Sequence, residues 1–167
     1  MLVVRGTKKL LDRVGPITLQ PQEASTTRLG DWYATAWFWK PQVALLVSEA
    51  TLFPVLMPLA PAATLLTRFP DHLARALADQ DVPEAFISDE LARMSDARLA
   101  KTASRSLLGI MNEFTFLAER TGDDAHSAAA DLTELGRWLA TTPCGPRFKR
   151  HISPDRELHA LVDGYRK

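Results

Sequence analysis

The chain has 167 residues, of which 46% are hydrophobic and 24% are charged. This length and composition are typical of one globular domain that buries a core without disulfides, so we expect a single domain over residues 1–167. Twenty basic and 20 acidic residues give a formal net charge of zero. This balance excludes a polycationic protein that binds nucleic acid through bulk charge, although a local basic site is still allowed.

The N-terminal half carries strand signals. Residues 2–5 form a short β-branched run, and Thr7 is placed to cap a helix over 8–14 that Gly15 and Pro16 end. The polar, turn-rich stretch that follows is expected to be a loop.

Two apolar runs, 32–39 and 43–48, predict a β-hairpin. Residues 51–57 are a third strand or an irregular segment, and Pro54 restricts any strand there to a sheet edge. One face of the first run carries alternate residues, most of them aromatic: Tyr33, Thr35, Trp37 and Trp39. Such a row stacks bases in single-strand binders, but both faces of this strand are apolar, which favours burial under helices.

Helical spacing takes over from residue 62. Apolar residues recur every three or four positions through Leu77, with Pro70 and Asp71 suited to a helix start. The further expected elements are a helix after Pro83, a short strand over 98–102, and helices over 104–119, over 127–140 and from 154 onward. The pattern predicts an α+β fold, in which a small, mostly antiparallel sheet from the N-terminal half packs against a helical C-terminal half.

Cysteine and histidine form no metal-ligand pattern in this sequence. Cys144 is the only cysteine, which excludes an intramolecular disulfide and a cysteine-based zinc site. The four histidines have no HxH or HExxH spacing, so we expect neither a metal nor a cofactor. The first residues become charged too early for a signal peptide, and three prolines interrupt the longest apolar run, 52–66. We therefore expect a cytoplasmic protein without a membrane segment.

Charges gather in segments of the chain. Seven acids lie between Asp71 and Asp96 with two arginines among them, while the region from Arg147 onward is mainly basic. Solvated faces are the simplest interpretation of such runs. The alternative is a pair of complementary surfaces for a protein partner.

The segment from Lys101 to Phe114 has the pattern of a strand end followed by a helix. At about 100° per residue, one arc is apolar and predicts the core face: Leu107, Ile110, Met111, Phe114, Leu117 and Ala118. Arg105, Gly109 and Asn112 lie on the opposite side. A glycine in mid-helix costs about 1 kcal/mol relative to alanine. Gly109 therefore suggests that a ligand, another strand or a second subunit approaches the backbone there.

The start of this helix is suited to an anion. Free backbone N–H groups and the positive dipole end are joined by two cations and three hydroxyls, those of Lys101, Arg105, Thr102, Ser104 and Ser106. The alternative is that Ser104 is an ordinary N-cap and Arg105 a surface residue. The sequence has no Walker-type glycine loop, which argues against a nucleoside triphosphatase.

Three short motifs resemble those of a family of bacterial proteins described as a domain of unknown function. They are R-x-T-K-K from Arg5, L-G-D-W-Y-A from Leu29, and K-T-x-x-R-S-x-x-G-x-M-N-D from Lys101, where Glu113 replaces the final Asp. The resemblance covers most of the chain and implies no activity. It implies that the motif residues meet at one cleft, which brings together Arg5, Thr7, Lys8, Asp31, Trp32, Lys101, Arg105 and Asn112.

Our first hypothesis is a binding module for a phosphate-bearing ligand, either a nucleic acid or a nucleotide. The expected contacts are cationic, polar and aromatic side chains, namely Arg5, Thr7, Lys8, Trp32, Lys101, Thr102, Arg105, Ser106 and Asn112. A phosphoester-cleaving or phosphoryl-transfer enzyme in the same pocket is the second hypothesis. There Asp31 or Glu113 is the general base, and Arg105 stabilises charge in the transition state. A protein-interaction module is the third.

Overall fold

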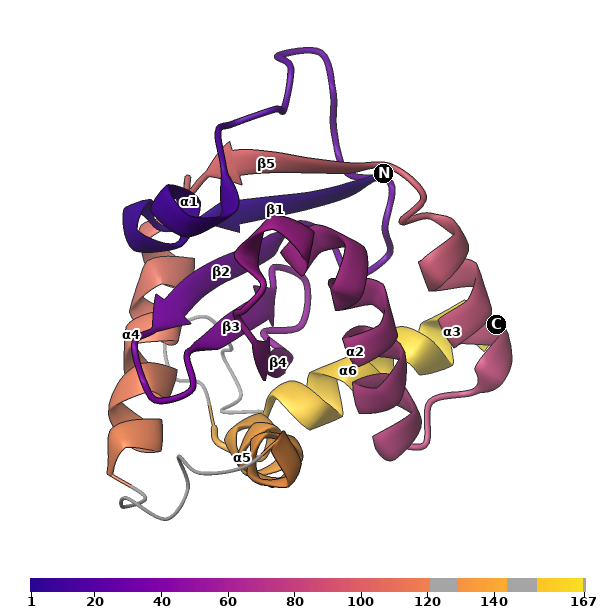
Figure 1. Ribbon diagram of the computed structural model, residues 1–167. Coiled ribbons are helices and arrows are strands. Elements are labelled where there is room, and N and C mark those ends of the chain that lie inside the picture. The colour runs from indigo at the N-terminus through magenta and orange to yellow at the C-terminus, as the bar shows by residue number, and fades with distance from the viewer. Residues whose placement is uncertain (121–128, 144–152, 167) are drawn as a thin grey trace.

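One sheet of five strands is the framework of the computed structural model, which describes residues 1–120, 129–143 and 153–166 (Figure 1). The strands are β1 (Leu2–Gly6), β2 (Trp32–Trp37), β3 (Val43–Ser48), β4 (Pro54–Pro58) and β5 (Ala97–Lys101). Their order is β4-β3-β2-β1-β5, so β4 lies at a sheet edge, as its prolines predict.

The α+β prediction is confirmed, and the sheet is mixed rather than mostly antiparallel. β2 pairs with β3 and β3 with β4 in antiparallel fashion, whereas β1 is parallel to both β2 and β5. The parallel pairs arise because helices lie in the connections from β1 to β2 and from β4 to β5, and such crossovers return the chain in the same direction.

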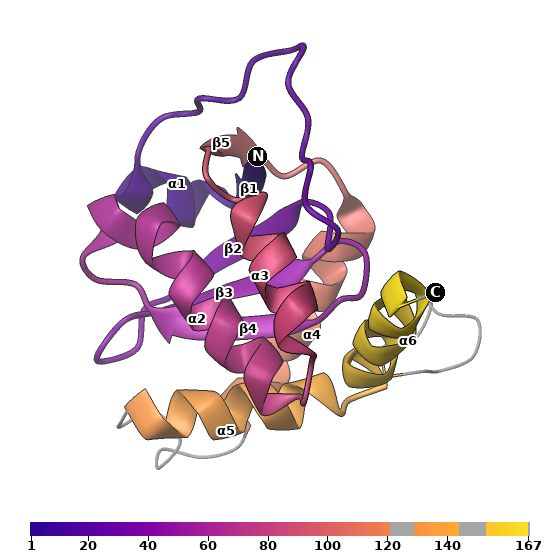
Figure 2. The same cartoon turned by 90° about the vertical axis from the view of Figure 1, so that its right-hand side faces the viewer.

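Helices cover both faces of the sheet (Figures 1 and 2). They are α1 (Lys8–Val14), α2 (Leu65–Asp79, after the 3-10 turn η1, Ala62–Thr64), α3 (Glu84–Ala92), α4 (Arg105–Glu119), α5 (Ala129–Ala140) and α6 (Pro154–Arg166). Apolar residues of α1, α2, α3 and α6 share one core with the first face of the sheet. Those of α4 and α5 share a second core with the opposite face. Figure 2 shows α5 crossing below α2 and β4.

Burial on both faces explains the apolar runs of β2 and β3, in which every residue is buried. Tyr33 and Trp37 lie under α4, where the Trp37 indole N–H donates a hydrogen bond of 2.8 Å to the Thr115 hydroxyl. The core interpretation is therefore confirmed for Tyr33, Thr35 and Trp37, whereas Trp39 follows the strand, is half-buried and stacks on Trp37.

Helix α2 begins earlier than Pro70 suggests and continues through it. Leu65, Phe69, Leu73 and Leu77 recur every four residues and are fully buried. Burying each such side chain contributes about 1.5–3 kcal/mol, and together they outweigh the roughly 3 kcal/mol that a proline costs inside a helix. The helical pattern predicted from residue 62 is therefore confirmed, whereas Pro70 and Asp71, which suit a helix start, lie inside α2.

Helix α4 has the predicted orientation. Its inner arc is buried apart from the half-buried Leu117, and Arg105, Gly109 and Asn112 are exposed. The Ser104 hydroxyl accepts a hydrogen bond of 3.2 Å from the Leu107 N–H, so Ser104 is the N-cap.

Among the described helices none has the length and apolar character to cross a bilayer, and the described residues contain no group of three metal-ligating side chains. Cys144 and much of the basic C-terminal region, including Arg147, Lys149 and Arg150, lie outside the described residues.

Candidate ligand-binding groove

The carboxyl ends of β1 and β5 lie side by side at one edge of the sheet. The strands are parallel, and Gly6 at the end of β1 is opposite Lys101 at the end of β5. The helices that follow diverge, because α1 packs on the first face of the sheet and α4 on the second. In open sheets with parallel strands, this divergence creates a crevice where ligands bind. The topology by itself marks this edge as a candidate site.

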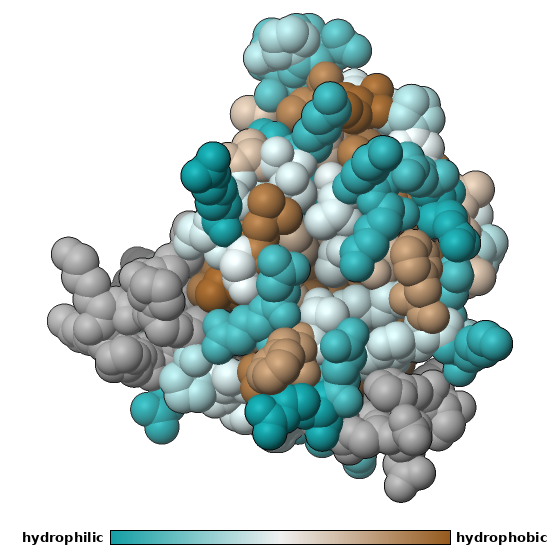
Figure 3. Space-filling view, turned by 90° about the vertical axis from the view of Figure 1, so that its left-hand side faces the viewer, coloured by the Kyte–Doolittle hydropathy of each residue, from teal (hydrophilic) through white to brown (hydrophobic). Residues whose placement is uncertain are grey.

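A groove of about 760 Å³ lies at this edge. Its volume is in the range of small-molecule sites. Figure 3 shows the side of the molecule that carries α1 and α4, where brown hydrophobic atoms near the top of the view lie between teal hydrophilic ones. The groove, called the lysine groove below, is lined by Gly6, Lys8, Leu11, Asp12, Gly15, Pro16, Ile17, Lys101 and Thr102.

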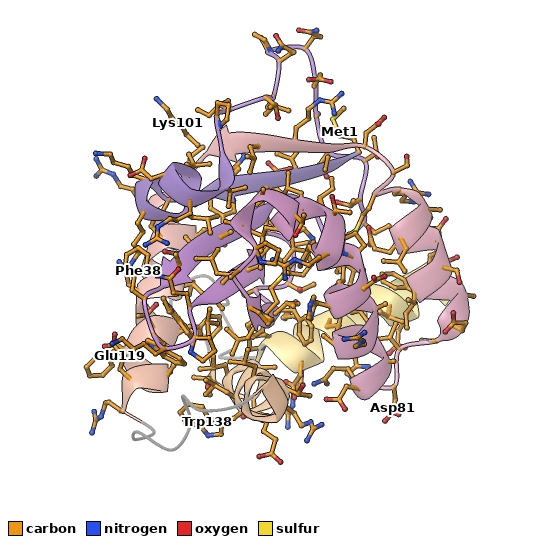
Figure 4. The ribbon with its side chains drawn as sticks, viewed as in Figure 1. Met1, Phe38, Asp81, Lys101, Glu119 and Trp138 are labelled. Atoms are coloured by element: carbon orange, nitrogen blue, oxygen red, sulfur yellow. The ribbon has the colours of Figure 1, made fainter. Side chains whose placement is uncertain are left out.

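Lys8 and Lys101 bring positive charge to the lysine groove from two different elements. Lys8 is the first residue of α1, and Lys101 extends from the end of β5 toward solvent (Figure 4). Neither ammonium group forms an ion pair with a described residue. Asp12 is the one carboxylate among the described lining residues, so the two cations outnumber it. With the Thr102 hydroxyl nearby, the arrangement suits an anion.

The other lining residues of the lysine groove are largely apolar. Helix α1 ends at Gly15, whose φ of 142° lies in the region that favours glycine. Pro16 and Ile17 follow on the groove wall together with Leu11, and Ile17 is 43% exposed. A large apolar side chain exposed beside two cations is an arrangement that an amphipathic ligand would cover.

Arg5 and Asp31 meet on the opposite face of the sheet. Alternation along β1 separates the side chain of Arg5 from the groove side of Gly6. The Arg5 Nε atom lies 2.6 Å from Asp31 Oδ2, and Arg5 Nη1 donates a hydrogen bond of 3.1 Å to the Lys101 carbonyl. The Asp31 N–H donates to Glu49 Oε2 at 3.3 Å. This Arg5–Asp31 cluster joins the start of β2 to the ends of β1 and β5.

Tyr33 lies next to this cluster. Burial raises the pKa of Tyr33, so its hydroxyl stays protonated.

Trp32 and Thr7 have structural roles that the sequence did not indicate. Trp32 is 0% exposed and packs edge-on against Phe69, with ring centroids 5.0 Å apart, so the prediction that it stacks on a ligand was wrong. Thr7 precedes α1 but makes no side-chain cap bond. Its hydroxyl is instead 3.0 Å from the hydroxyl of Thr35, with which it forms a hydrogen bond.

The remaining motif residues lie along α4, away from the lysine groove. Arg105, Ser106, Asn112 and Glu113 are exposed and do not line it. Arg105 forms no ion pair with Asp31 or Glu113. Apart from the neighbouring backbone of α4 itself, no described atom lies within 4 Å of where a Cβ of Gly109 would be, so no described strand makes the close approach predicted there. The third motif therefore divides, with Lys101 and Thr102 in the groove and the α4 residues outside it.

Two features escaped the sequence interpretation. The groove wall from Leu11 to Ile17 had one signal, an apolar residue directly after a helix-ending Gly15-Pro16. Glu90 belongs to the acid-rich stretch expected to be solvated, yet it is 0% exposed. Its Oε1 accepts a hydrogen bond of 2.9 Å from the Arg28 N–H, whereas Oε2 has no partner among the described residues. Burial raises the pKa of this carboxyl.

Comparison with protein-family models matches residues 3–157 to a domain of unknown function (DUF6933). No curated protein and no solved structure matches the chain. The match spans nearly all of the elements described above, and it includes both the lysine groove and the Arg5–Asp31 cluster.

Proposed function

We propose that this chain, which belongs to the DUF6933 family, is a binding module for a small phosphate-bearing ligand, a mononucleotide above all, held in the lysine groove. One observation carries the proposal. Lys8 lies just after β1, and Lys101 is the last residue of the adjacent parallel strand β5. Both border one groove, and neither has an ion-pair partner among the described residues.

The groove residues supply the contacts that a mononucleotide requires. The two ammonium groups and the Thr102 hydroxyl donate hydrogen bonds to phosphate oxygens. Leu11 and Ile17 offer apolar surface to a base or sugar ring, and the Asp12 carboxylate accepts a hydrogen bond from a hydroxyl or amino group.

Charge and burial favour a small ligand over a nucleic-acid strand. The formal net charge is zero. Of the aromatic rings proposed for base stacking, those of Trp32, Tyr33 and Trp37 are buried, and that of Trp39 is half-buried and stacks on Trp37. Strand binders need a basic track with exposed aromatic platforms. The unpaired cations of the groove instead form a local site.

The other two hypotheses receive less support from the geometry. Asp31 is engaged by Arg5, and Glu113 lies outside the groove, so neither residue is placed to act as a base on a ligand there. In the acid-rich segment, Asp79 binds Arg137 and Asp89 binds Arg28 and Arg93. Hydrogen bonds from these two arginines lower the pKa of Asp89. Part of the acidic surface is thus already balanced within the chain.

Isothermal titration calorimetry with adenosine 5′-monophosphate tests the proposal, with adenosine and a short single-stranded oligonucleotide as separate titrants. We expect the monophosphate to bind and adenosine to bind at least about 10-fold more weakly, since one charge-assisted hydrogen bond contributes about 1.5–3 kcal/mol. Lys101→Ala should weaken binding by a similar factor. Lys9→Ala removes the same charge from the same helix, outside the groove, and should leave binding unchanged.

Two outcomes contradict the proposal. Equal affinity for adenosine and its monophosphate removes the role of phosphate, and equal losses in Lys9→Ala and Lys101→Ala reduce the effect to overall charge. Preference for the oligonucleotide would favour the nucleic-acid alternative.

A further inference from the structure

A second concave site lies at the opposite edge of the sheet from the lysine groove, where β4, α2 and α5 meet. It has a volume of about 360 Å³, within the range of small-ligand sites. Phe53, Val55, Leu56 and Leu132 give it an apolar lining, and the same lining includes His72 and Arg75. We call it the β4 pocket. No residue of the lysine groove belongs to it.

One of the two arginines that line the β4 pocket has no carboxylate partner among the described residues. Arg137 donates hydrogen bonds to both carboxylate oxygens of Asp79, at 2.8 and 2.7 Å from Nη2, and this pair joins α5 to α2. No described carboxylate pairs with Arg75, which also lines the pocket. Burial, followed by the charges of Arg75 and Arg68, lowers the pKa of His72, so its imidazole is neutral near pH 7. The net charge of the wall is therefore positive.

The edge of β4 offers a backbone donor as well. Antiparallel residues alternate between hydrogen-bonded and non-hydrogen-bonded positions. The Ser48 N–H donates to the Phe53 carbonyl and the Leu59 N–H to the Gln42 carbonyl, each at 3.0 Å, which makes the odd-numbered residues of this stretch the bonded ones. The backbone groups of Pro54, Leu56 and Pro58 therefore point away from β3, toward the open edge of the sheet. Of these three residues only Leu56 has an N–H. All three residues line the pocket.

Gly136 keeps the α5 side of the pocket open. It lies within α5 and lines the pocket, and nothing described lies within 4 Å of the position of an added Cβ. A mid-helix glycine is unfavourable for helix stability relative to alanine. The space beside it is consistent with a ligand that occupies this side of the pocket.

We infer that the β4 pocket binds a small carboxylic acid with an apolar chain. The carboxylate is held by Arg75 and the Leu56 N–H, and the chain lies against Phe53, Val55 and Leu132. The prolines that flank Leu56 remove the other outward donors, which disfavours addition of a peptide strand and favours a small ligand with one acceptor group. This site is independent of the function proposed for the lysine groove.

Octanoate is the probe, titrated by calorimetry into the full chain, with 1-octanol as the uncharged comparison. We expect octanoate to bind about 10-fold more tightly than octanol, and Arg75→Ala to remove that preference. Gly136→Leu should abolish octanoate binding by filling the pocket. Gly164→Leu is its control, because Gly164 also lies in a helix with open space around it but lines neither described site. Lys101→Ala should bind octanoate as the wild type does.

Four results would overturn the inference: no octanoate binding by the wild type, equal affinity for octanol, octanoate affinity unchanged in Gly136→Leu, or loss of binding in Lys101→Ala. Because Leu at position 136 is bulky, Gly136→Ala is tested in parallel. The added methyl meets no described atom within 4 Å, so this variant should fold and bind octanoate more weakly than the wild type. Unchanged affinity in a folded Gly136→Ala variant would count against the site.

Discussion

The two faces of the sheet around β1 carry similar kinds of residues in opposite states. On the α1 side, Lys8 and Lys101 border an open groove without described ion-pair partners. On the α4 side, Arg5 binds Asp31 and the carbonyl of Lys101. Side-chain alternation along β1 directs Arg5 to one face and Gly6 to the other. Lys101 is opposite Gly6 in the register, and Lys8 begins α1, which packs on that same face. The turn before β2 supplies a carboxylate, that of Asp31, only to Arg5. The difference teaches that a charged motif residue indicates binding only where the fold leaves its charge unpaired.

The strongest test of this comparison removes both free cations. We expect Lys8→Ala/Lys101→Ala to lose about 100-fold in affinity for adenosine 5′-monophosphate, since each lost charge-assisted contact is worth about 10-fold. The thermal unfolding midpoint should stay within about 1 °C of the wild type, because exposed side chains away from packed sites contribute little to stability. Calorimetric titration and thermal unfolding check the two parts. A large fall in the midpoint would mean that the lysines are structural.

The converse test breaks the satisfied pair. Arg5→Ala leaves the Asp31 carboxylate unpaired with 14% of its side chain exposed. The burial of this ion pair is intermediate. An exposed pair contributes up to about 1 kcal/mol, and disruption of a buried pair costs about 3–5 kcal/mol, so we expect a loss of about 2 kcal/mol in unfolding free energy. The midpoint should fall by about 4–8 °C. Nucleotide affinity should change less than twofold, and a 10-fold loss would place Arg5 in the binding site.

Glu90 extends the comparison to a charge that is neither exposed nor fully bonded. Its pKa is raised by burial, so the folded state binds its proton more tightly than the unfolded state. Stability is therefore lost as pH rises from the unfolded value of 4.5 through the folded value, and the whole penalty is present above it. Glu90→Gln should raise the unfolding free energy by about 1 kcal/mol at pH 7, and the gain should shrink toward pH 4. Denaturant melts at both pH values measure this, and a gain that does not depend on pH would exclude the carboxyl charge as its cause.

The smallest expected effect concerns the exposed face of α4. Gly109→Ala should raise the unfolding free energy by up to about 1 kcal/mol, because the methyl group enters open space and favours the helix. Thermal unfolding measures it. Nucleotide affinity in the same variant sharpens the comparison, since a selective loss of binding would show that the ligand reaches α4 as well as the lysine groove.

Local signals predicted much of the fold. The Ser104 cap, the apolar arc of α4, the β2–β3 hairpin and the edge position of the proline-bearing β4 all follow from neighbouring residues, and all are present. The parallel pairing of β1 with β5 did not follow, because it joins residues such as Leu2 and Ala97 that are far apart in the sequence. The same long-range pairing decides which motif residues share a face.

The candidate site was predicted only in part. Lys8 and Lys101 line one groove, and they belong to the set that the resemblance implied would meet, whereas Trp32 is core and Arg5 is paired. A sequence shows that a tryptophan or an arginine is present, but not whether a phenylalanine from a later helix covers it or a carboxylate from a later turn binds it. The answer depended on Phe69 and Asp31, whose positions are set by tertiary packing.

The place of β1 in the sheet also orders events during synthesis. This strand leaves the ribosome before its neighbours, yet one of its two edges stays open until residues 97–101 have been translated. An open strand edge invites pairing with other chains, and pairing over a long sequence separation is slow. We therefore expect nascent chains that end before residue 97 to aggregate more readily than chains in which β5 has paired with β1.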